Sequence, residues 1–392
     1  MTPNFFQKII LVLSVAVFMQ ISACYGQNAV IPGAWRTENY FPFLRQHLSI
    51  GVVANASSTI GQKHLVDSLL SAGIRVKKIF APEHGFRGEA EAGEFIQNKI
   101  DEKTGLPIIS LYGVQKKPSS MQMSGLDVMV FDIQDVGVRF FTYISTLYYI
   151  MEACAEEAIP LLVLDRPNPN GDYIDGPMLD LSFRSFVGIV PIPIVYGMTI
   201  GELARMLNEE GWLKNGMRCE LTVIPLDGYT HATPVILDHN PSPNLPNIQS
   251  IRLYPSLCLF EATDISVGRG TDFPFQVIGF PDLKFGSFIF VPHSIPGKSL
   301  HPLHEGDTCY GIDLRWDTLH TRFTLKFVLD YYHLSNWGEK FFKNSKFFDQ
   351  LAGTSLLRSQ ILDGLNEDQI RESWQPQLQE FMLKRKPYLL YP

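Results

Sequence analysis

The chain has 392 residues, 45% of them apolar, and carries a formal net charge of −7. This length allows a large buried core and predicts two domains rather than one. Because the acidity is mild and no basic block is present, nucleic acid is excluded as an expected partner.

The N-terminus contains the one long apolar segment of the sequence, where Lys8 precedes an apolar stretch at residues 9–23. This stretch is too short for a comfortable transmembrane helix, so residues 1–26 are predicted to be an export signal. The letters ISAC, which end at Cys24, resemble a bacterial lipobox and would make Cys24 a lipidated N-terminus. Ordinary cleavage after Gly26 is the alternative. The protein is therefore expected in the periplasm or as a lipoprotein whose membrane attachment is the lipid on Cys24.

Apolar, β-rich runs alternate with helical patterns in the N-terminal half. The predicted strands cover residues 48–55, 76–82, 106–112, 127–133 and 159–166. The predicted helices cover residues 61–73, 141–158 and 199–213. Thr199 is the expected N-cap of the last helix, with Glu202 as its capping-box partner. Runs that are apolar throughout are buried on both faces, so the alternation predicts a Rossmann-like, doubly wound parallel α/β sheet.

The pattern becomes mixed after about residue 215. Strand-like runs cover residues 219–226, 288–294 and 309–316, and helical patterns cover residues 323–334, 337–348, 355–365 and 366–386. We therefore predict a Rossmann-like domain at residues 27–215 and a smaller, mixed α/β domain at residues 216–392.

Four of the five predicted strands end in a dense group of polar residues. In an open parallel sheet, ligands bind in the crevice beyond the carboxyl ends of the strands, so the four groups are predicted to share one rim. The groups are Asn55 with Ser57, Ser58 and Thr59; Glu83, His84 and Arg87; Asp132, Gln134, Asp135 and Arg139; and Asp165, Arg166, Asn168 and Asn170.

Some of these residues also have simple structural interpretations. Asp135 can be only the N-cap of the next helix, and Arg139 can simply pair with Asp132 or Asp135. His84 alone would more often be a hydrogen-bonded structural histidine. The charged groups taken together are harder to explain, because they would repel or desolvate one another without a ligand or mutual pairing.

Motifs for common cofactors are missing from the sequence. It has no GxSxG elbow, HExxH, CxxC or P-loop, and no GxGxxG follows the first strand, so no cofactor and no transition metal are expected. Asp132 and Asp135 could still hold a hard cation. Carboxylates among Arg, Asn, Gln and aromatic residues suit glycoside hydrolysis. In that reaction, one carboxylic acid protonates the leaving oxygen and a second carboxylate acts as base or nucleophile.

Several long motifs resemble the NamZ-type exo-β-N-acetylmuramidases, a family formerly carried as a domain of unknown function. They are APEHGFRGEAEAGE, DVMVFDIQDVGVRFFTYIST, VLDRPNPNG and SPNLPNIQSIRLYPSLCLFEATDISVGRGTDFPFQVIG, in this order. The resemblance implies a Rossmann-like domain, a smaller C-terminal domain and an active-site cleft between them. It also implies release of N-acetylmuramic acid from the non-reducing end of peptidoglycan fragments, with MurNAc-GlcNAc and muropeptides as partners.

Carried onto this sequence, the resemblance implies Glu83 as one acid/base candidate and Asp132 or Asp135 as the other. Asp132 ends its strand and is expected to point most directly into the crevice. The residues expected to line the sugar site are Asn55, His84, Arg87, Gln134, Arg139, Tyr143, Asp165, Arg166, Asn168, Asn244, Glu261, Arg269 and Thr271. The lactyl carboxylate of N-acetylmuramic acid suits a bidentate arginine, for which Arg139, Arg166 and Arg269 are the candidates.

Three alternatives stay open at the level of sequence. Hydrolysis can retain or invert the anomeric configuration, or the 2-acetamido group of the sugar can itself act as nucleophile. The protein can also be a surface lipoprotein that binds muropeptides without cleaving them. An esterase or amidase acting on cell-wall substituents is a weaker hypothesis, because the nucleophile elbow and the metal motifs are missing.

Overall fold

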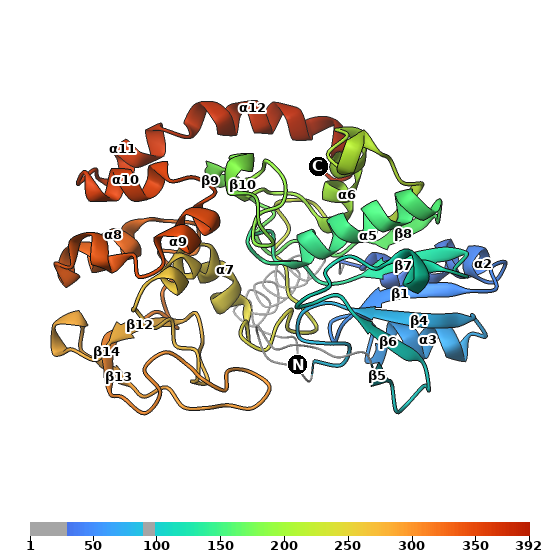
Figure 1. The fold of residues 1–392 in the computed structure, drawn as a ribbon, viewed down its shortest axis with the longest axis horizontal. Coiled ribbons are helices and arrows are strands. Elements are labelled where there is room, and N and C mark those ends of the chain that lie inside the picture. The colour runs from blue at the N-terminus through green and yellow to red at the C-terminus, as the bar shows by residue number, and fades with distance from the viewer. Residues whose placement is uncertain (1–29, 89–98) are drawn as a thin grey trace, which may run out of the picture.

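The computed structural model describes residues 30–88 and 99–392 (Figure 1). The predicted export signal at residues 1–26, including Cys24, lies outside the described residues. Across the described ranges, none of the helices has the length and apolar character needed to cross a membrane.

A seven-stranded sheet forms the centre of the N-terminal half, in the order β11-β8-β7-β1-β4-β6-β5. Its strands are β1 (Ile50–Ala54), β4 (Val76–Ala81), β5 (Lys99–Ile100), β6 (Pro107–Ser110), β7 (Val128–Asp132), β8 (Leu161–Leu164) and β11 (Leu221–Ile224). Neighbouring strands are parallel except for β5 with β6. The predicted doubly wound parallel sheet is confirmed.

Alternate residues of the central strands enter two different cores, which explains the unbroken apolar runs. In β7, Val128 and Val130 belong to one core, whereas Met129 and Phe131 belong to the other. Helices α5 (Tyr143–Glu157) and α6 (Ile200–Glu209) cover one face of the sheet, and α2 (Phe41–Leu44) and α3 (Leu65–Ser71) cover the other. Smaller elements of this half are β2 (Thr59–Ile60), β3 (Lys63–His64), α4 (Ser120–Met123), β9 (Asp175–Met178) and β10 (Pro193–Val195).

Helix α6 begins with the predicted capping box. Thr199 Oγ1 accepts a hydrogen bond from Glu202 N at 3.2 Å, and Thr199 N donates to Glu202 Oε2 at 2.9 Å. The box satisfies two backbone N–H groups that a helix start otherwise leaves without an intrahelical partner.

The central sheet extends beyond the predicted domain boundary at residue 215. Strand β11 pairs in parallel with β8, although its sequence was grouped with the smaller domain. The physical reason is that β11 is an edge strand, so only Ile224 among its residues is buried. Its apolar pattern is therefore broken, unlike that of the central strands.

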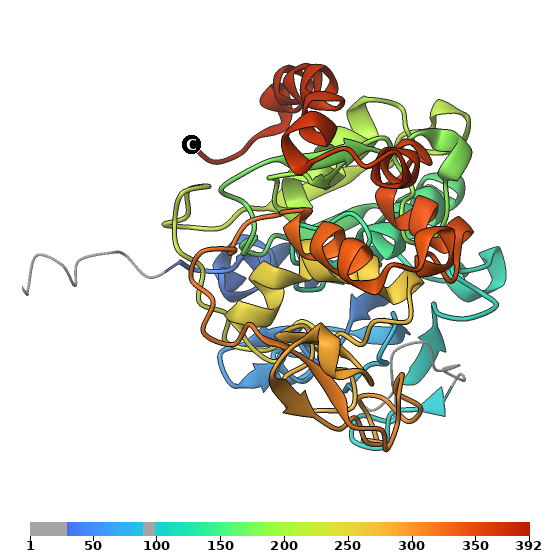
Figure 2. The ribbon, with the colours of Figure 1, turned by 90° about the vertical axis from the view of Figure 1, so that its left-hand side faces the viewer.

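The C-terminal half combines helices with a three-stranded antiparallel sheet in the order β12-β14-β13. Figure 2 looks onto this half, with helix α7 in yellow and the later helices in orange and red. Its elements are α7 (Ile248–Leu257), η5 (Cys258–Ala262), β12 (Val277–Phe280), β13 (Phe288–Phe290), β14 (Cys309–Asp313), α8 (Lys326–Ser335), α9 (Ser345–Ala352), α10 (Leu356–Leu362), α11 (Glu367–Glu372) and α12 (Gln375–Arg385).

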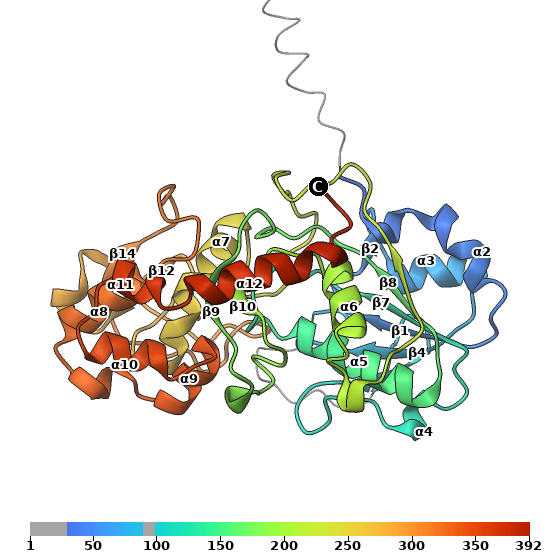
Figure 3. The same cartoon turned by 90° about the horizontal axis from the view of Figure 1, so that it is seen from above.

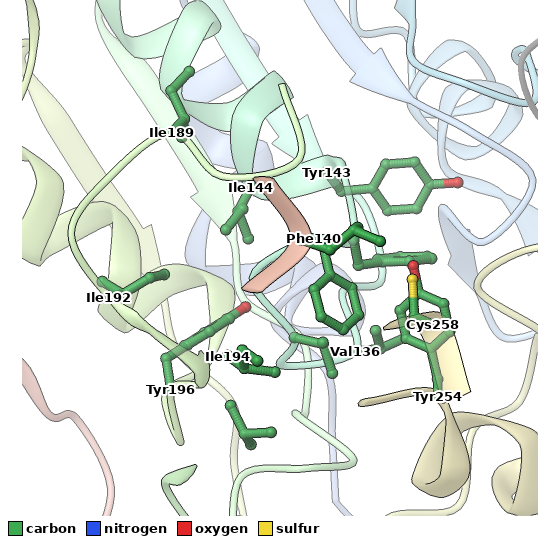
Figure 4. Packing of buried hydrophobic residues seen from close by; sticks show 14 of the residues in the cluster. Val136, Phe140, Tyr143, Ile144, Ile189, Ile192, Ile194, Tyr196, Tyr254 and Cys258 are labelled. Atoms are coloured by element: carbon green, nitrogen blue, oxygen red, sulfur yellow. The ribbon is translucent and has the colours of Figure 1, made fainter. Parts of the chain in front are cut away.

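One hydrophobic core runs through both halves, since Phe131 of the sheet and Phe260 of η5 belong to the same cluster. Figure 4 shows part of this core, with Phe140 beside Tyr254 and Cys258. Helix α12 runs back from the C-terminal half toward α6 (Figures 1 and 3). Beyond it, Tyr391 donates to Asp165 Oδ2 at 2.6 Å, which fastens the chain end to the sheet. The shared hydrophobic core and the attachment of the C-terminal segment to the sheet therefore fix the two halves relative to each other.

Candidate active site

A cavity of about 670 Å³ lies between the two halves, beyond the carboxyl ends of β4, β6 and β7. From the N-terminal half it is lined by Glu83, His84, Tyr112, Lys116, Phe140, Phe141, Thr142, Phe186 and Val187. From the C-terminal half it is lined by Ser242, Asn244, Leu245, Tyr254, Cys258, Glu261, Arg269, Phe275, Lys298, Ser299, Leu300, His301, Phe347 and Leu351. A cavity of this size, with both polar and aromatic walls, suits a small polar ligand such as a sugar.

Glu83 is the carboxylate on the sheet side of this cavity. Its Oε2 accepts a hydrogen bond from Thr142 Oγ1 at 2.8 Å. Burial raises the pKa of Tyr112, and the charge of Glu83 and a hydrogen bond to it raise that pKa further. The Tyr112 phenol therefore stays protonated and can donate to the carboxylate. Two hydroxyl groups thus orient the Glu83 carboxylate.

The backbone next to Glu83 turns sharply, which keeps the carboxylate at the cavity edge. His84 has a left-handed φ of 69° and Gly85 has a φ of 76°. His84 Nε2 lies 3.1 Å from Ser242 Oγ, on the far wall. Non-glycine residues with positive φ are uncommon and often lie at functional sites. His84 therefore joins the loop after β4 to the segment that precedes α7.

Glu261 and Arg269 form an ion pair on the C-terminal wall. Arg269 Nε donates to Glu261 Oε1 at 2.6 Å, and Cys258 Sγ donates to Glu261 Oε2 at 3.4 Å. Burial alone would lower the pKa of Arg269, but the Glu261 carboxylate outweighs it and the net shift is upward. Arg269 Nη1 and Asn244 Oδ1 are buried and have no hydrogen-bond partner among the described residues. This wall therefore offers one donor and one acceptor to a ligand.

Asp132 does not line this cavity, contrary to the expectation that it points into the crevice. It is fully buried and accepts from Arg166 Nε at 2.6 Å and from Arg166 Nη2 at 2.8 Å. Burial raises the pKa of the Asp132 carboxyl and the Arg166 guanidinium opposes that rise. The strand end is covered because Ser58 donates to the Asp132 carbonyl oxygen. Asp132 and Arg166 therefore neutralise each other beneath the rim.

Asp135 is also fully buried and outside the cavity lining. It accepts from Gly137 N at 2.7 Å and from the Tyr196 hydroxyl. Burial raises its pKa to about 6, although those hydrogen bonds oppose the rise. Asp135 Oδ1 has no partner within the described part of the chain. The carboxyl thus shapes the loop after β7, which is close to the simple structural interpretation of its sequence position.

Arg139 is not among the residues that line the cavity, so the structure does not place it where the lactyl group was predicted to bind. The side chain is fully buried and donates to four backbone carbonyl oxygens, those of Pro177, Ile192, Leu351 and Ala352. It pairs with neither of the aspartates considered from sequence. Burial lowers its pKa to about 9, so Arg139 remains charged at neutral pH and joins the two halves of the molecule.

The polar group after β8 also serves the fold. Asp165 accepts from Thr199 Oγ1 and Gly201 N, at 2.7 Å each, and so binds the start of α6. Asn168 Nδ2 donates to Met198 O at 2.8 Å. Gln134 Nε2 donates to Asp135 O and to Pro167 O, at 2.7 Å each. These side chains hold neighbouring loops together instead of lining the Glu83 cavity.

The remaining predicted residues lie around the site at different distances from the cavity wall. Asn55 Oδ1 accepts from Ser57 Oγ at 2.6 Å, and Tyr143 donates to Pro241 O at 3.1 Å. Thr271 Oγ1 donates to Gly268 O at 2.6 Å, which shapes the loop that carries Arg269. Arg87 Nε pairs with Asp101 Oδ1 at 2.8 Å and borders a different surface pocket. Of the predicted set, Glu83, His84, Asn244, Glu261 and Arg269 line the cavity.

The polar strand ends do not share one cavity because another segment crosses the rim. His239 Nδ1 lies 3.2 Å from Thr59 Oγ1, and Pro241 and Ser242 contact Tyr143 and His84. Residues 239–242 thus contact the segments that follow β1, β4 and β7. Sequence could not show this, because the segment has no periodic pattern and follows the sheet strands in the chain.

The main residue missed from sequence is Tyr112. It is the last residue of the third predicted strand, the one strand end without a dense polar group, and so it was passed over. Position at the carboxyl end of a parallel strand was the available signal. Within the described residues, no group of three or more His, Cys, Asp or Glu side chains is placed to hold a metal ion.

Comparisons with known proteins agree with this architecture. The sequence-family model described as exo-beta-N-acetylmuramidase NamZ, N-terminal, matches residues 50–249, and the corresponding C-terminal family model matches residues 252–391. The peptidoglycan beta-N-acetylmuramidase NamZ of Bacillus subtilis (strain 168) is 39% identical, over 87% of this chain and 86% of its own. Crystal structures of two DUF1343 family proteins from Bacteroides fragilis NCTC 9343 superpose with TM-scores of 0.85 and 0.81, at 46% and 26% identity. Each match covers 93% of this chain and 99% of the other. The chain belongs to the NamZ exo-β-N-acetylmuramidase family, as its motifs indicate.

Replacing Asp135 with Asn should change how stability depends on pH. Because the folded state holds the Asp135 proton up to a pKa of about 6, against a usual value of 3.8, the wild-type free energy of unfolding loses a contribution as pH rises through this range. The Asn side chain does not titrate, so the variant should gain roughly 3 kcal/mol relative to wild type between these pH values. Urea unfolding from pH 4 to pH 7 measures the difference. A difference that stays constant with pH would contradict the shift, and the exposed Asp238→Asn variant is the control.

Replacing Arg139 with Met should destabilise the protein by several kcal/mol, on the order of 5, because four buried carbonyl groups lose their donor. Gly353→Ala should act in the same direction, since a Cβ there would lie 2.6 Å from Arg139 Nη2. Thermal unfolding measures both effects, with the exposed Arg218→Met variant as control. If Arg139→Met instead left stability unchanged and raised only KM, Arg139 would be a substrate ligand after all.

Proposed function

We propose that this protein is an exo-acting glycoside hydrolase that releases N-acetylmuramic acid from the non-reducing end of peptidoglycan fragments. The observation that carries the proposal is Glu83, a carboxylate held by two hydroxyl groups at the edge of a polar, aromatic cavity. The 39% identical Bacillus subtilis protein, a peptidoglycan beta-N-acetylmuramidase, supports the substrate class. We also propose that the protein is exported, since the predicted signal would place it among cell-wall fragments.

In this proposal Glu83 acts as the acid and then as the base. The protonated carboxyl gives its proton to the glycosidic oxygen as the bond from that oxygen to the sugar C1 breaks. The hydroxyl groups of Thr142 and Tyr112 donate to the carboxylate that results, so they favour this proton transfer. In this first step the oxygen of the sugar's 2-acetamido group attacks C1 and forms a bond to it. A water molecule then adds to C1 as the bond from C1 to the acetamido oxygen breaks, and the water gives one proton to Glu83.

The buried aspartates have supporting roles in the proposed mechanism. Asp132 and Asp135 are fully buried and outside the cavity lining, so we assign them to positioning the loop after β7. That loop carries Phe140, Phe141 and Thr142 to the cavity. Glu261 is the second carboxylate of the cavity among the described residues, and its pairing with Arg269 holds it beside the sugar. A fixed negative charge there favours the positive charge that develops at C1.

We propose Arg269 as the residue that recognises the lactyl carboxylate of N-acetylmuramic acid. Arg139 and Arg166, the other two candidates from sequence, are outside the lining of this cavity and donate to backbone carbonyl groups or to Asp132. Arg269 has a buried Nη1 without a partner in the described chain, and Phe275 supports its guanidinium from 5.0 Å. A carboxylate would satisfy this donor through a charge-assisted hydrogen bond.

Glu83→Gln should lower kcat for a chromogenic N-acetylmuramide by about 10²–10⁴-fold, because the amide cannot donate the proton. The free energy of unfolding of Glu83→Gln should stay close to that of wild type. The matched control is Glu339→Gln on the exposed surface, which should keep wild-type activity. Mass spectrometry after incubation with the MurNAc-GlcNAc disaccharide should show free N-acetylmuramic acid. If wild-type protein bound the disaccharide without cleaving it, the protein would be a muropeptide-binding protein and the proposal would fail.

Arg269→Lys should lower kcat/KM for the muramide by about 10–100-fold, because one charged hydrogen bond to the lactyl group is lost. The matching N-acetylglucosaminide lacks that group, so any residual hydrolysis of it should change little. The ratio of the two kcat/KM values measures selectivity, with Arg315→Lys as a control in another arginine–carboxylate pair. An equal loss on both substrates would show that Arg269 serves the fold and not the selection of substrate.

A further inference from the structure

A second cavity, of about 340 Å³, lies where the direction of the central sheet reverses. Strand β1 lies in the middle of the sheet, with β4 on one side of it and β7 on the other. The chain passes first to β4 and later returns to β7 and β8, so the strand order reverses between β1 and β7. Ser57 follows β1, Gln134 follows β7 and Arg166 follows β8, and all three line this cavity. In doubly wound sheets, such a switch point is the usual place for a ligand. The Glu83 cavity lies elsewhere, over β4, β6 and the loop after β7.

The two cavities are separate, since they have no lining residue in common. Residues 233–239 form the outer wall of the second cavity, and Ser242, three residues on, lines the first. His239 contacts Thr59 beside β1, whereas Ser242 contacts His84 after β4. A ligand in the second cavity would therefore bind without displacing the substrate at Glu83.

The second cavity offers hydrogen-bonding atoms that the protein leaves unused. Arg166 uses Nε and Nη2 for Asp132 and Thr59 O, but no partner is found in the described chain for its Nη1. Gln134 commits Nε2 to two carbonyl groups, and no described residue pairs with its Oε1. Both residues line the cavity. His239 contacts Thr59 through Nδ1, which leaves Nε2 for a ligand.

The net charge of these walls favours a neutral ligand. The Arg166 guanidinium is already paired with the Asp132 carboxylate. Asp238 adds a negative charge at the cavity edge, so an anion such as a phosphate or a carboxylate would find little attraction. The ligand should therefore offer hydroxyl or amide groups instead of charge.

The apolar part of the wall suits the face of a ring and a methyl group. Trp35 Nε1 donates to Thr59 O at 3.1 Å, which fixes the indole in place. Val30, Pro32, Val235 and Leu237 complete an apolar side. Aromatic side chains that are rigid and partly exposed give large contact area at low entropic cost. The volume is at the small end of ligand sites, which matches one ring better than a longer chain.

We propose that this second cavity binds a single neutral 2-acetamido sugar, an N-acetylglucosamine unit of the glycan, as a site apart from the catalytic cavity. The ring would lie on Trp35, the hydroxyl groups would meet Arg166 Nη1 and Gln134 Oε1, and the acetamido methyl would pack on the apolar side. Such a site would hold glycan near the enzyme independently of bond cleavage at Glu83.

The full-length protein labelled with 5-fluorotryptophan tests this site, because only Trp35 of the five tryptophans lines the cavity. Fluorine NMR should show a saturable shift of the Trp35 signal on titration with methyl N-acetyl-β-glucosaminide. Trp35→Phe assigns the signal by removing it. His239→Ala should weaken binding by about 10-fold, and His239→Gln, which keeps a hydrogen-bonding side chain, should restore part of it. The exposed His333→Ala variant is the matched control, and the other tryptophan signals report folding.

The outcomes separate this inference from the proposed function. No saturable shift of the Trp35 signal up to the solubility limit of the glycoside would overturn it, and so would a shift that inorganic phosphate produces equally well. Methyl glucoside, which lacks the acetamido group, should bind more weakly, and equal binding would overturn the assignment to an acetamido sugar. Chromogenic muramide hydrolysis by His239→Ala should equal that of wild type. If the wild-type protein did not hydrolyse the muramide, this result would count against the proposed role of Glu83 and not against this site.

Discussion

The buried guanidinium of Arg139 is the contact on which the shape of the cavity depends. It follows strand β7 and donates to Pro177 O and Ile192 O on one side and to Leu351 O and Ala352 O, at the end of α9, on the other. Helix α9 contributes Phe347 and Leu351 to the cavity lining, so the same cation holds both walls. Four carbonyl dipoles replace a carboxylate partner, and burial lowers the pKa without removing the charge at neutral pH. Gly353 follows α9 without a side chain because a Cβ would meet this guanidinium.

Most charge at the strand ends is compensated within the protein before any ligand arrives. Asp132 pairs with Arg166, Asp165 binds the start of α6, and Asp135 accepts from Tyr196 and Gly137. Each pairing or hydrogen bond offsets part of the cost of burying the group. Glu83 lines the cavity on one side of residues 239–242, and Arg166 with Gln134 lines the cavity on the other. The crossing segment thus divides one predicted rim into two chemically different cavities.

Sequence predicted the parts that depend on local pattern. The central strands and the capping box of α6 follow from apolar runs and from the Thr199–Glu202 spacing, and both were correct. The direction of Asp132 could not be predicted, because it depends on an arginine 34 residues away that folds over the strand end. The place of β11 was missed because an edge strand shares one face with solvent and loses the buried pattern. Tyr112 was missed because its strand end carries little charge, although topology brings it to the same edge.

The stretch FDIQDVGVRFFTY shows how charged residues at a strand end can be bound within the fold. Asp132 and Asp135 are buried, and both bind atoms of neighbouring loops, so they fix the path of the chain after β7. Arg139 ties that path to the opposite half. With the loop fixed, Thr142 is the residue that reaches Glu83, at 2.8 Å. A rigid support for a hydrogen bond of this kind reduces the reorganisation needed when charge moves during reaction. The aspartates therefore contribute to Glu83 through Thr142, and the carboxylate that meets the cavity comes from a different strand.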